Sequence, residues 1–521
     1  MFGLEKLQGK ALYNIMSAAC GSAFMLYGYD AGVLGGIQET KQFRAAIGNP
    51  QGAFIIPVIA SIYNLAAGIM ALCVILFGMQ IGRKGTIQLG NLFIVIGAAL
   101  QSSTFSVGQI IAGRIVAGMG IGCIASAVPT YMAEMSLQAD QRGPEVSYQL
   151  ALLITGVAGA YWLDFGFVQG LDAHPWLWRI PLALQSCFAI FSAVLLFSLP
   201  DTPRWYYARG RNDEGDHCLA RLFALPVDHE TVQAQRDEVL GSMKEEAADS
   251  ESFNWLLLFW DNSELQFGRR LRTSFLINWA QQFLGINMLV YFSTQIFTNL
   301  NYSPFISGIL AGVLNTCFAL ASYPPIYFIE KVGRRAMMFW GAIACGICML
   351  VYVALTNLKN PTVATNWTAV VFIILYEVVF AFGWLGTCWV YGPEIAPLRY
   401  RHVAGAMGAA GEWFSTWVMV FGGGTGINAV GAPIFAWPLI CCFLAAAYVW
   451  FLCPETTGLT LEEIDVLFAR GDAKARIAAN TTQRRNSTTG SITEHRRRAS
   501  AAGSMGEKGG MGHNEKGQNM A

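Results

Sequence analysis

Five polar side chains inside apolar stretches are the residues of this sequence most suited to chemistry. Gln281, Gln282 and Asn287 share one apolar block, Asp30 lies in the first block, and Arg114 lies in the fourth. Amides offer both hydrogen-bond donors and acceptors, and a carboxylate can carry a proton. Because polar groups in such surroundings are costly unless they find partners or line water, these residues indicate a functional site.

The three amides cannot share one narrow helix face, since Gln281 and Gln282 point about 100° apart. The wider arc that they cover can still line a cavity. Hydrogen bonding between neighbouring helices is the alternative interpretation for each amide.

The elements that hold these residues are predicted to be membrane-spanning helices. Only 13% of the 521 residues are charged and 54% are apolar, whereas soluble domains carry about 25% charged residues. This composition excludes an ordinary soluble enzyme, and the balance of 34 Lys+Arg against 34 Asp+Glu gives no field for nucleic acid. A span needs about 20 mostly apolar residues. Twelve blocks qualify, at 12–35, 54–77, 87–104, 107–131, 147–167, 178–199, 273–297, 306–329, 337–356, 367–391, 403–426 and 432–453.

The distribution of Lys and Arg predicts the orientation. Basic residues gather after even-numbered spans, so we expect those loops and both termini to be cytoplasmic. The first block is too long for a signal-peptide core and is expected to stay as an anchor. Two glycosylation sequons, at Asn301 and Asn366, then lie on the outer side, close to the bilayer.

Five segments follow: a cytoplasmic N-terminus (1–11), a six-helix bundle (12–199), a polar cytoplasmic linker with helical stretches (200–272), a second bundle (273–453) and a cytoplasmic tail (454–521). The tail is expected to be disordered after about residue 470. Basic residues precede Ser487 and Ser500, so kinase control of the tail is a second interpretation.

Landmarks at nearly one offset indicate an internal duplication. Gly82-Arg-Lys recurs as Gly333-Arg-Arg 251 residues later, and Pro200-Asp-Thr-Pro recurs as Pro454-Glu-Thr-Thr 254 residues later. Glu134 and Glu394, 260 residues apart, close corresponding spans. Parallel halves of this kind place a substrate site between them near the bilayer midplane.

At these motifs the chain resembles the sugar porter family of the major facilitator superfamily, in a fungal-type version. The matching strings are Gly28-Tyr-Asp-Ala-Gly-Val33, Gly113-Arg114 with Gly118, Gly120 and Gly122, Pro129-Thr-Tyr-Met-Ala-Glu134, PDTPR at 200, Gln281-Gln-Phe-Leu-Gly-Ile-Asn287 and PETTG at 454. The resemblance covers roughly 12–465. It implies an all-α membrane protein with twelve transmembrane helices in two pseudo-symmetric six-helix bundles.

The resemblance also implies a substrate cavity lined by amides and tryptophans. Its residues are Gln149, Gln281, Gln282, Asn287, Asn315, Trp389 and Trp413. An indole face packs against the C–H face of a sugar ring. Glu412 departs from the family pattern, which has Asn or Gln there, and we include it in the substrate site. A carboxylate would bind polyols well but would repel an anionic sugar acid unless protonated.

Basic and acidic residues at the inner helix ends are expected to latch a cytoplasmic gate, with simple positive-inside anchoring as the alternative. The set is Arg83, Lys84, Glu134, Arg142, Glu330, Arg334, Arg335, Glu394 and Arg401. The family has an acid three residues before the glycine of each motif. Glu330 satisfies this in the second half, but Met79 stands there in the first, so we expect a weaker latch in that half.

Asp30 and Arg114 are the expected proton-coupling pair, because the resemblance implies that they face each other. Burial favours a neutral acid, whereas a nearby arginine favours the carboxylate, and alternating between these states makes a proton switch. A static structural ion pair is the alternative interpretation.

The cysteines are expected to be buried thiols rather than disulfides, among them Cys20, Cys73, Cys123, Cys187, Cys317, Cys388 and Cys453.

The sequence contains no nucleotide loop, metal cluster or nucleophile triad, so we predict neither an enzyme nor a bound cofactor or metal. The partners expected are a sugar or polyol, protons and the lipid bilayer, with the protein acting as a monomer in the plasma membrane. Two alternatives stay open: a sugar sensor that does not transport, and a carrier or exporter of another small polar metabolite, such as a sugar acid.

Overall fold

The computed structural model describes residues 7–136, 142–171, 174–248, 255–261, 263–396, 400–459, 461–470 and 474. All regular elements in these ranges are helical, which confirms the all-α prediction. The first half contains α1 (Gly9–Ile37), α2 (Lys41–Ala46), α3 (Ile55–Ile81), α4 (Arg83–Ser102), α5 (Val107–Met135), α6 (Arg142–Gly170) and α7 (Trp176–Phe197). Three linker helices follow, α8 (Pro203–Ala208), α9 (Asn212–Phe223) and α10 (Glu230–Ala248), and then the short helix η3 (Trp255–Leu258).

The second half repeats this plan with more breaks. Its elements are α11 (Phe267–Phe283), α12 (Ile286–Asn299), α13 (Pro304–Ala321), α14 (Pro325–Val332), α15 (Arg334–Thr356), α16 (Val363–Phe380), η4 (Ala381–Leu385), α17 (Thr387–Ile395), α18 (Arg401–Val430), η6 (Ala432–Phe435), α19 (Ala436–Leu452) and α20 (Leu461–Phe468). Each of the twelve predicted spans falls on one of these helices or on a broken run of two or three.

Nine helical runs in the described residues are long and apolar enough to cross a membrane. The predicted spans at 12–35, 273–297 and 403–426 are not among the nine. The second of these is divided into α11 and α12, of 17 and 14 residues, each shorter than a full span. The other two are the long helices α1 and α18, each of which carries several glycines and one acidic residue.

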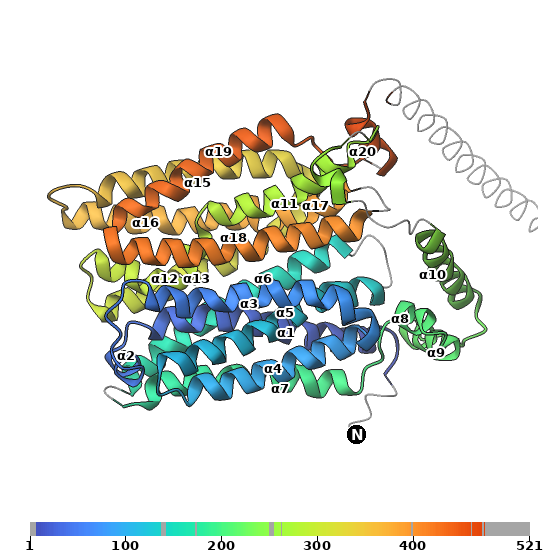
Figure 1. The fold of residues 1–521 in the computed structure, drawn as a ribbon, viewed down its shortest axis with the longest axis horizontal. Helices are drawn as coiled ribbons and strands as arrows, with labels where there is room; N and C mark the ends of the chain where they lie inside the picture. The colour runs from blue at the N-terminus through green and yellow to red at the C-terminus, as the bar shows by residue number, and fades with distance from the viewer. Residues whose placement is uncertain are drawn as a thin grey trace, which may run out of the picture.

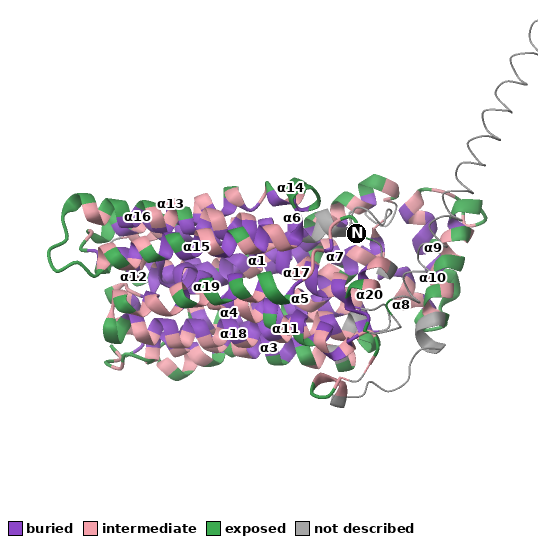
Figure 2. Ribbon diagram, turned by 90° about the horizontal axis from the view of Figure 1, so that it is seen from above, coloured by how far each residue is buried: buried purple, intermediate pink, exposed green. Residues whose placement is uncertain are grey.

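The helices form two bundles that lie side by side (Figure 1). Helices α1 and α3 to α7 make one bundle, and α11 to α19 make the other. The seam between them is formed where α3 packs against α18 and α6 against α13. Buried positions gather along the middle of the helical body in Figure 2. The linker helices α8 to α10 lie at one end of the body, called here the inner end, and α2 lies at the opposite, outer end.

Both halves close their inner ends with the same local structure, as the duplication predicts. In each half, an acid in the segment after the sixth span caps the helix that forms the third span. In the first half, Asp201 Oδ1 accepts from the backbone N–H of Arg83, where α4 begins. In the second half, Glu455 Oε1 accepts from the backbone N–H of Arg334, where α15 begins. The preceding glycines, Gly82 and Gly333, have φ of 91° and 97°. A Cβ on either would collide with the capping carboxylate, so only glycine fits.

A tyrosine contact also recurs in both halves. Tyr131 donates to the carbonyl of Pro200 at 2.8 Å, and Tyr391 donates to that of Pro454 at 2.9 Å. Each bond ties the inner end of one helix to the segment that carries the capping acid. Two equivalent contacts in different sequence surroundings support the interpretation of two homologous halves.

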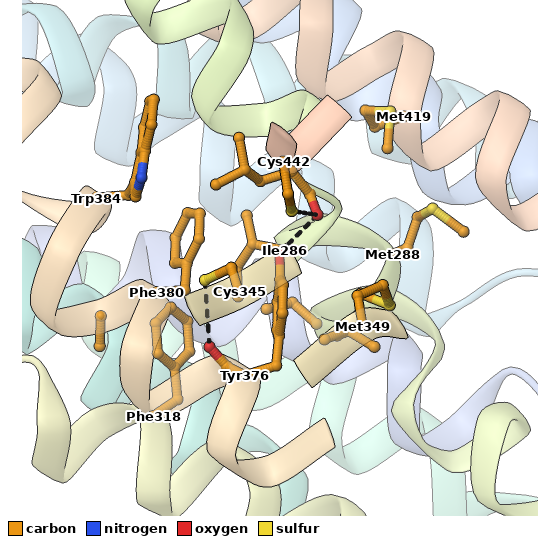
Figure 3. Packing of buried hydrophobic residues seen from close by; sticks show 14 of the residues in the cluster. Ile286, Met288, Phe318, Cys345, Met349, Tyr376, Phe380, Trp384, Met419 and Cys442 are labelled. Carbon is orange, nitrogen blue, oxygen red and sulfur yellow. Dashed lines mark hydrogen bonds between the residues drawn. The ribbon is translucent and has the colours of Figure 1, made fainter. Parts of the chain in front are cut away.

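The break between α11 and α12 is held by the core of the second half. Gly285, with φ of 103°, separates the two helices. The carbonyl of Leu284 accepts from Tyr376 Oη at 2.6 Å and from Cys442 Sγ at 4.0 Å, side chains that converge in Figure 3. This break places Gln281 and Gln282 in the last turn of α11 and Asn287 in the first turn of α12, so the two helix ends meet at one place.

All twelve cysteines are free thiols. Most are buried, but the expectation of burial is wrong for Cys187, which lies exposed on α7, and only partly met by Cys73 and Cys317. Their helices present these positions to the outer surface of the bundle rather than to its interior. Cys345 and Cys348, which are three positions apart on α15, are both buried.

Candidate functional site

A chain of hydrogen bonds links three of the predicted substrate residues. Gln282 Nε2 donates to Glu412 Oε1 at 2.5 Å, which joins α11 to α18. Asn287 Nδ2 donates to Gln282 Oε1 and, at 3.5 Å, to Thr416 Oγ1. The break at Gly285 makes this possible, because it brings the start of α12 back over the end of α11. The outcome is a polar cluster at the junction of three helices.

Gln281 points in another direction from Gln282, as helix geometry predicts. Its Nε2 donates to the carbonyls of Trp384 at 3.1 Å and Leu385 at 3.0 Å. Both carbonyls belong to η4, a π-helical turn between α16 and α17, whose backbone acceptors are displaced from ordinary helical bonding. Gln281 therefore ties α11 to this turn, and its Oε1 is buried without a partner among the described residues.

Asn315 and Gln149 lie in α13 and α6, on opposite sides of the seam. Asn315 Nδ2 donates to the carbonyl of Ala311 at 2.9 Å and to Ser293 Oγ at 3.3 Å. Gln149 is nearly fully buried. The structure therefore buries one amide from each half, on two helices that pack against each other across the seam.

Aromatic side chains bring the two halves together beside the amide cluster. Trp413 of α18 is buried and packs on Tyr27 of α1, with ring centroids 5.5 Å apart. Trp389 of α17 joins the same apolar cluster and keeps part of its surface accessible. Our sequence analysis missed Tyr27, although it stands inside a span directly before the Gly28-Tyr-Asp30 string.

Asp30 and Arg114 form a buried ion pair. Arg114 Nη1 donates to Asp30 Oδ1 at 2.9 Å, and both side chains are 0% exposed. The guanidinium lies over the ring of Tyr63 at 4.2 Å, a cation–π contact that sequence analysis did not predict. Tyr291 of the second half reaches the same region, where its hydroxyl donates to Asn64 Oδ1 at 3.3 Å. The pair therefore lies beside the seam.

Contacts between the halves on the outer side of this pair hold the seam closed there. Gln38 Nε2 donates to the carbonyl of Tyr291 at 2.8 Å, and Tyr161 Oη to that of Val290 at 2.5 Å. Asn428 Nδ2 donates to the carbonyl of Ala53 at 2.8 Å, farther out. Gly35 packs so tightly on Tyr161 that a Cβ there would collide with the tyrosine hydroxyl.

The predicted gate residues of the first half pair within that half. Arg83 Nη2 donates to Glu134 Oε1 at 2.7 Å. Lys84 Nζ donates to the carbonyls of Phe197 and Leu199, where α7 ends. The bonds tie α4 to α5 and to the end of α7. The side chain of Arg142 lies outside the described residues.

The second half has the same arrangement with one more acid. Arg334 contacts Glu394 at 2.7 Å and Glu330 at 2.5 Å. Arg335 Nη2 donates to the carbonyl of Trp450 at 2.6 Å. The expected pairs therefore form, and each joins helices of one half. The side chain of Arg401 lies outside the described residues.

Two further carboxylates in the spans were missed by sequence analysis. Asp164 of α6 packs against Gly36 of α1, where a Cβ would collide with its Oδ2. Glu377 of α16 is fully buried, and neither of its oxygens has a partner among the described residues. Both could have been found by the argument that singled out Asp30, namely an acid inside an apolar block.

The two sequon asparagines differ at the outer end. Asn301 is exposed with φ of 65° and lines a cavity of about 570 Å³ together with Asn299 and Asn428. Asn366 is partly buried and donates to the carbonyl of Leu300 at 3.2 Å. Nowhere in the described residues do three His, Cys, Asp or Glu side chains lie close enough together to hold a metal ion.

Comparisons with known proteins agree with this geometry. A curated relative, "Major facilitator superfamily transporter mfsA" of Aspergillus fumigatus, is 30% identical over 490 residues, which cover 90% of this chain and 89% of the relative. "Sugar transporter STL1" of Saccharomyces cerevisiae is 29% identical over 479 residues, covering 89% and 82%.

Solved structures give the same fold. The xylose transporter XylE from E. coli in a partially occluded inward-open conformation superposes with a TM-score of 0.71 at 19% identity, covering 86% of this chain and 99% of that one. XylE described as a proton:xylose symporter bound to 6-bromo-6-deoxy-D-glucose gives 0.72 at 21% identity, covering 88% and 100%. The family model "Sugar (and other) transporter" matches residues 15–468. This chain therefore belongs to the sugar (and other) transporter family, with the major facilitator fold.

Proposed function

We propose that this protein imports a monosaccharide or a related polyol across the plasma membrane by alternating access, with proton symport. The observation that carries the proposal is the polar cluster of Gln282, Asn287 and Glu412, which lies beside the aromatic contact between the halves. A carrier of sugars needs a site lined by polar side chains between two bundles that can move relative to each other. The names of STL1 and XylE support a sugar as cargo.

Substrate is held by amides from several helices and by the accessible surface of Trp389. Each hydrogen bond contributes about 1 kcal/mol net, so a handful gives affinities between micromolar and millimolar. Such affinities allow release as well as binding. Gln149 and Asn315 contribute from the two sides of the seam, so the substrate contacts both halves.

Proton coupling is assigned to Asp30 and Arg114. Protonation of Asp30 removes the charge that holds Arg114, and the arginine then turns to its remaining neighbours, Tyr63 and the carbonyl of Ala60. Because Tyr291 reaches this region from the second half, the movement of Arg114 alters the contacts between the two halves. One proton moving down 100 mV supplies about 2.3 kcal/mol, a concentration ratio of about 50-fold.

Gating uses the two ends of the seam in turn. The closed contacts of Gln38 and Tyr161 seal the outer side in this conformation. The inner pairs around Arg83 and Arg334 stiffen each half so that it moves as one body, and we expect these residues to latch the inner side through new contacts across the seam when the outer side opens. The inner end faces the cytoplasm, with both termini there, and the protein works as a monomer in the lipid bilayer.

Entrance counterflow in proteoliposomes tests the proposal. Purified protein is reconstituted with unlabelled glucose, xylose or glycerol inside, and labelled compound is added outside at low concentration. We expect transient accumulation of label for at least one compound, which a Gln282→Ala variant loses. Counterflow needs no proton gradient, so it separates a carrier from a sensor. No counterflow with any neutral sugar or polyol would refute the proposal.

A further inference from the structure

The outer end of the second half contains the cavity of about 570 Å³ that Asn301 helps to line. Its walls come from the outer ends of α12, α15 and α18 and from η6. None of the predicted substrate residues lines it, so it is separate from the amide cluster at the junction of α11, α12 and α18. Its volume lies within the range of about 300–1,000 Å³ that small-molecule sites occupy.

The floor of this cavity is apolar. The lining residues Ile296, Leu300, Tyr352, Ile427 and Phe435 are all buried. The rings of Tyr352 and Phe435 meet edge to face, with centroids 5.1 Å apart. An apolar ring of a ligand can pack on such a floor, because the burial of apolar area is favourable and aromatic rings attract one another.

The rim of the cavity is polar. The lining residues Thr298, Asn299, Asn301, Asn357 and Asn428 are all exposed. The side-chain amides of Asn299 and Asn301 have no hydrogen-bond partner among the described residues. Because an amide offers both donors and acceptors, the rim can bind the hydroxyl groups of a ligand in either direction.

Floor and rim together indicate the class of ligand. A bare monosaccharide would satisfy the rim but would leave most of the apolar floor in contact with water. A carboxylate or phosphate finds no basic side chain among the residues that line the cavity. A neutral glycoside with an apolar aglycone fits both parts, since the aglycone packs on Tyr352 and Phe435 while the sugar hydroxyls bind the asparagine amides.

Asn428 connects this cavity to the contacts that hold the seam closed on its outer side, called here the outer seal. Its Nδ2 donates to the carbonyl of Ala53 in the first half at 2.8 Å, and its Oδ1 accepts from Gln295 Nε2 at 2.5 Å. Gln295 lies on α12, one turn before the residues of that helix that form the rim. A ligand that packs between the ends of α12 and α18 therefore holds both Gln295 and Asn428 in their closed positions.

We propose that this cavity binds a neutral glycoside from the outer solution and that the bound glycoside keeps the outer seal closed. A ligand shifts a population only when it binds one conformation better than the other, and the position of Asn428 in the rim depends on its bond to Ala53. The glycoside then slows transport without occupying the substrate site. Its binding does not depend on the proposed function, because the two sites share no residue.

Equilibrium binding of labelled phenyl β-D-glucopyranoside tests the ligand class. The purified Gln282→Ala variant is used, because loss of this amide weakens the substrate site and leaves the outer cavity unchanged. We expect the phenyl glucoside to bind at least about tenfold more tightly than D-glucose, since its ring buries apolar surface on the floor. No binding, or binding no tighter than that of D-glucose, would overturn the inference.

A matched pair of variants tests the location. Asn299→Trp places a large side chain at the rim, and Gln169→Trp places the same side chain at an exposed residue at the outer end of α6. In the Gln282→Ala background, Asn299→Trp should weaken binding of the phenyl glucoside by about tenfold or more, because it fills the cavity. Gln169→Trp should change binding by less than about twofold. Equal binding by the two variants would show that the ligand lies elsewhere.

Entrance counterflow tests the effect on the outer seal. Saturating phenyl glucoside outside should lower the counterflow rate of the wild type by about fivefold, a typical coupling between two sites. The Asn299→Trp protein should transport at the normal rate and escape this inhibition. An uninhibited wild type would overturn the coupling, and inhibition that persists in Asn299→Trp would place the inhibitor in the substrate site. Absence of counterflow without the glucoside would instead refute the proposed function, and the binding experiments would still decide on the cavity.

Discussion

The two halves offer a matched pair of substitutions, Arg334→Gln and Arg83→Gln. The two arginines follow corresponding glycines and hold corresponding acids, Glu394 and Glu134. The two sites differ three residues before the glycine, where Glu330 stands in the second half and Met79 in the first. We expect Arg334→Gln to destabilise the protein more than Arg83→Gln.

The magnitudes follow from the contacts. Arg334 holds Glu394 by two hydrogen bonds, of 3.1 and 2.7 Å, and its side chain is only 6% exposed. Breaking a buried pair costs about 3–5 kcal/mol, and the partial exposure of Glu394 places this one near about 3 kcal/mol. Glu330 is 67% exposed, so its pair adds about 0–1 kcal/mol.

Arg83 makes fewer charged contacts. It holds Glu134 by one hydrogen bond of 2.7 Å, and its Nη1 contacts the thioether of Met79. A single charge-assisted bond contributes about 1.5–3 kcal/mol, so we expect a loss of about 2 kcal/mol. In the protein that retains Arg83, Met79→Glu should increase the free energy of unfolding by up to about 0.5 kcal/mol, because it adds an i,i+4 pair with Arg83.

Thermal unfolding of the purified variants in one detergent measures the ranking. Arg334→Gln should lower Tm more than Arg83→Gln, and Met79→Glu should raise it slightly. The double variant Arg334→Gln with Glu394→Gln should cost less than the sum of the single changes, because the two residues share the pair. An equal or larger loss from Arg83→Gln would refute the reasoning.

Three other expectations are open to test. Asp30→Asn should abolish substrate-driven alkalinisation of the medium while counterflow persists; proton uptake in this variant would exclude Asp30 from coupling. Burial pulls the pKa of Glu455 upward, but hydrogen bonds from Thr457, Thr456 and the backbone of Ala336 outweigh it and lower the pKa below its ordinary 4.5. The stabilisation that Glu455 provides is therefore complete above pH 4.5 and lost as the pH falls through the lower folded value, so Tm of Glu455→Gln should fall less on acidification than that of the wild type. Gln38→Ala should shift the population toward an outward-open state by about fivefold, the equivalent of one hydrogen bond, as measured by spin-label distances across the outer end.

Hydropathy and local motifs predicted most of the fold. Each predicted apolar block lies on helical structure. A membrane span must form its backbone hydrogen bonds within its own helix, so an apolar block of sufficient length predicts a helix without knowledge of distant partners. The glycine–basic strings likewise predicted the inner pairs, since Gly82 and Gly333 fix the chain geometry next to them. Breaks within helices were harder to see. At the break at Gly285, the Leu284 carbonyl is held by Tyr376 and Cys442, which lie about 90 and 160 residues away in the sequence.

The contacts of the site depend on how the halves pack, which sequence spacing does not encode. Tyr63 and Tyr291 meet near Arg114 from different bundles, and no motif places them there. The orientation of each amide likewise depends on a distant partner, such as the carbonyls of η4 that receive Gln281. Glu377 is a different case: the sequence carried the signal, an acid in an apolar block, and it was overlooked.

Accumulation of labelled substrate in proteoliposomes under an imposed pH gradient tests the central claim most directly. With the outside acidic, wild-type protein should concentrate a neutral sugar or polyol well above its external level, and a protonophore should collapse the accumulation. Asp30→Asn should only equilibrate the same compound. If the wild type equilibrates substrate without concentrating it, whatever the gradient, then the Asp30–Arg114 pair does not couple protons to transport, and the account is contradicted.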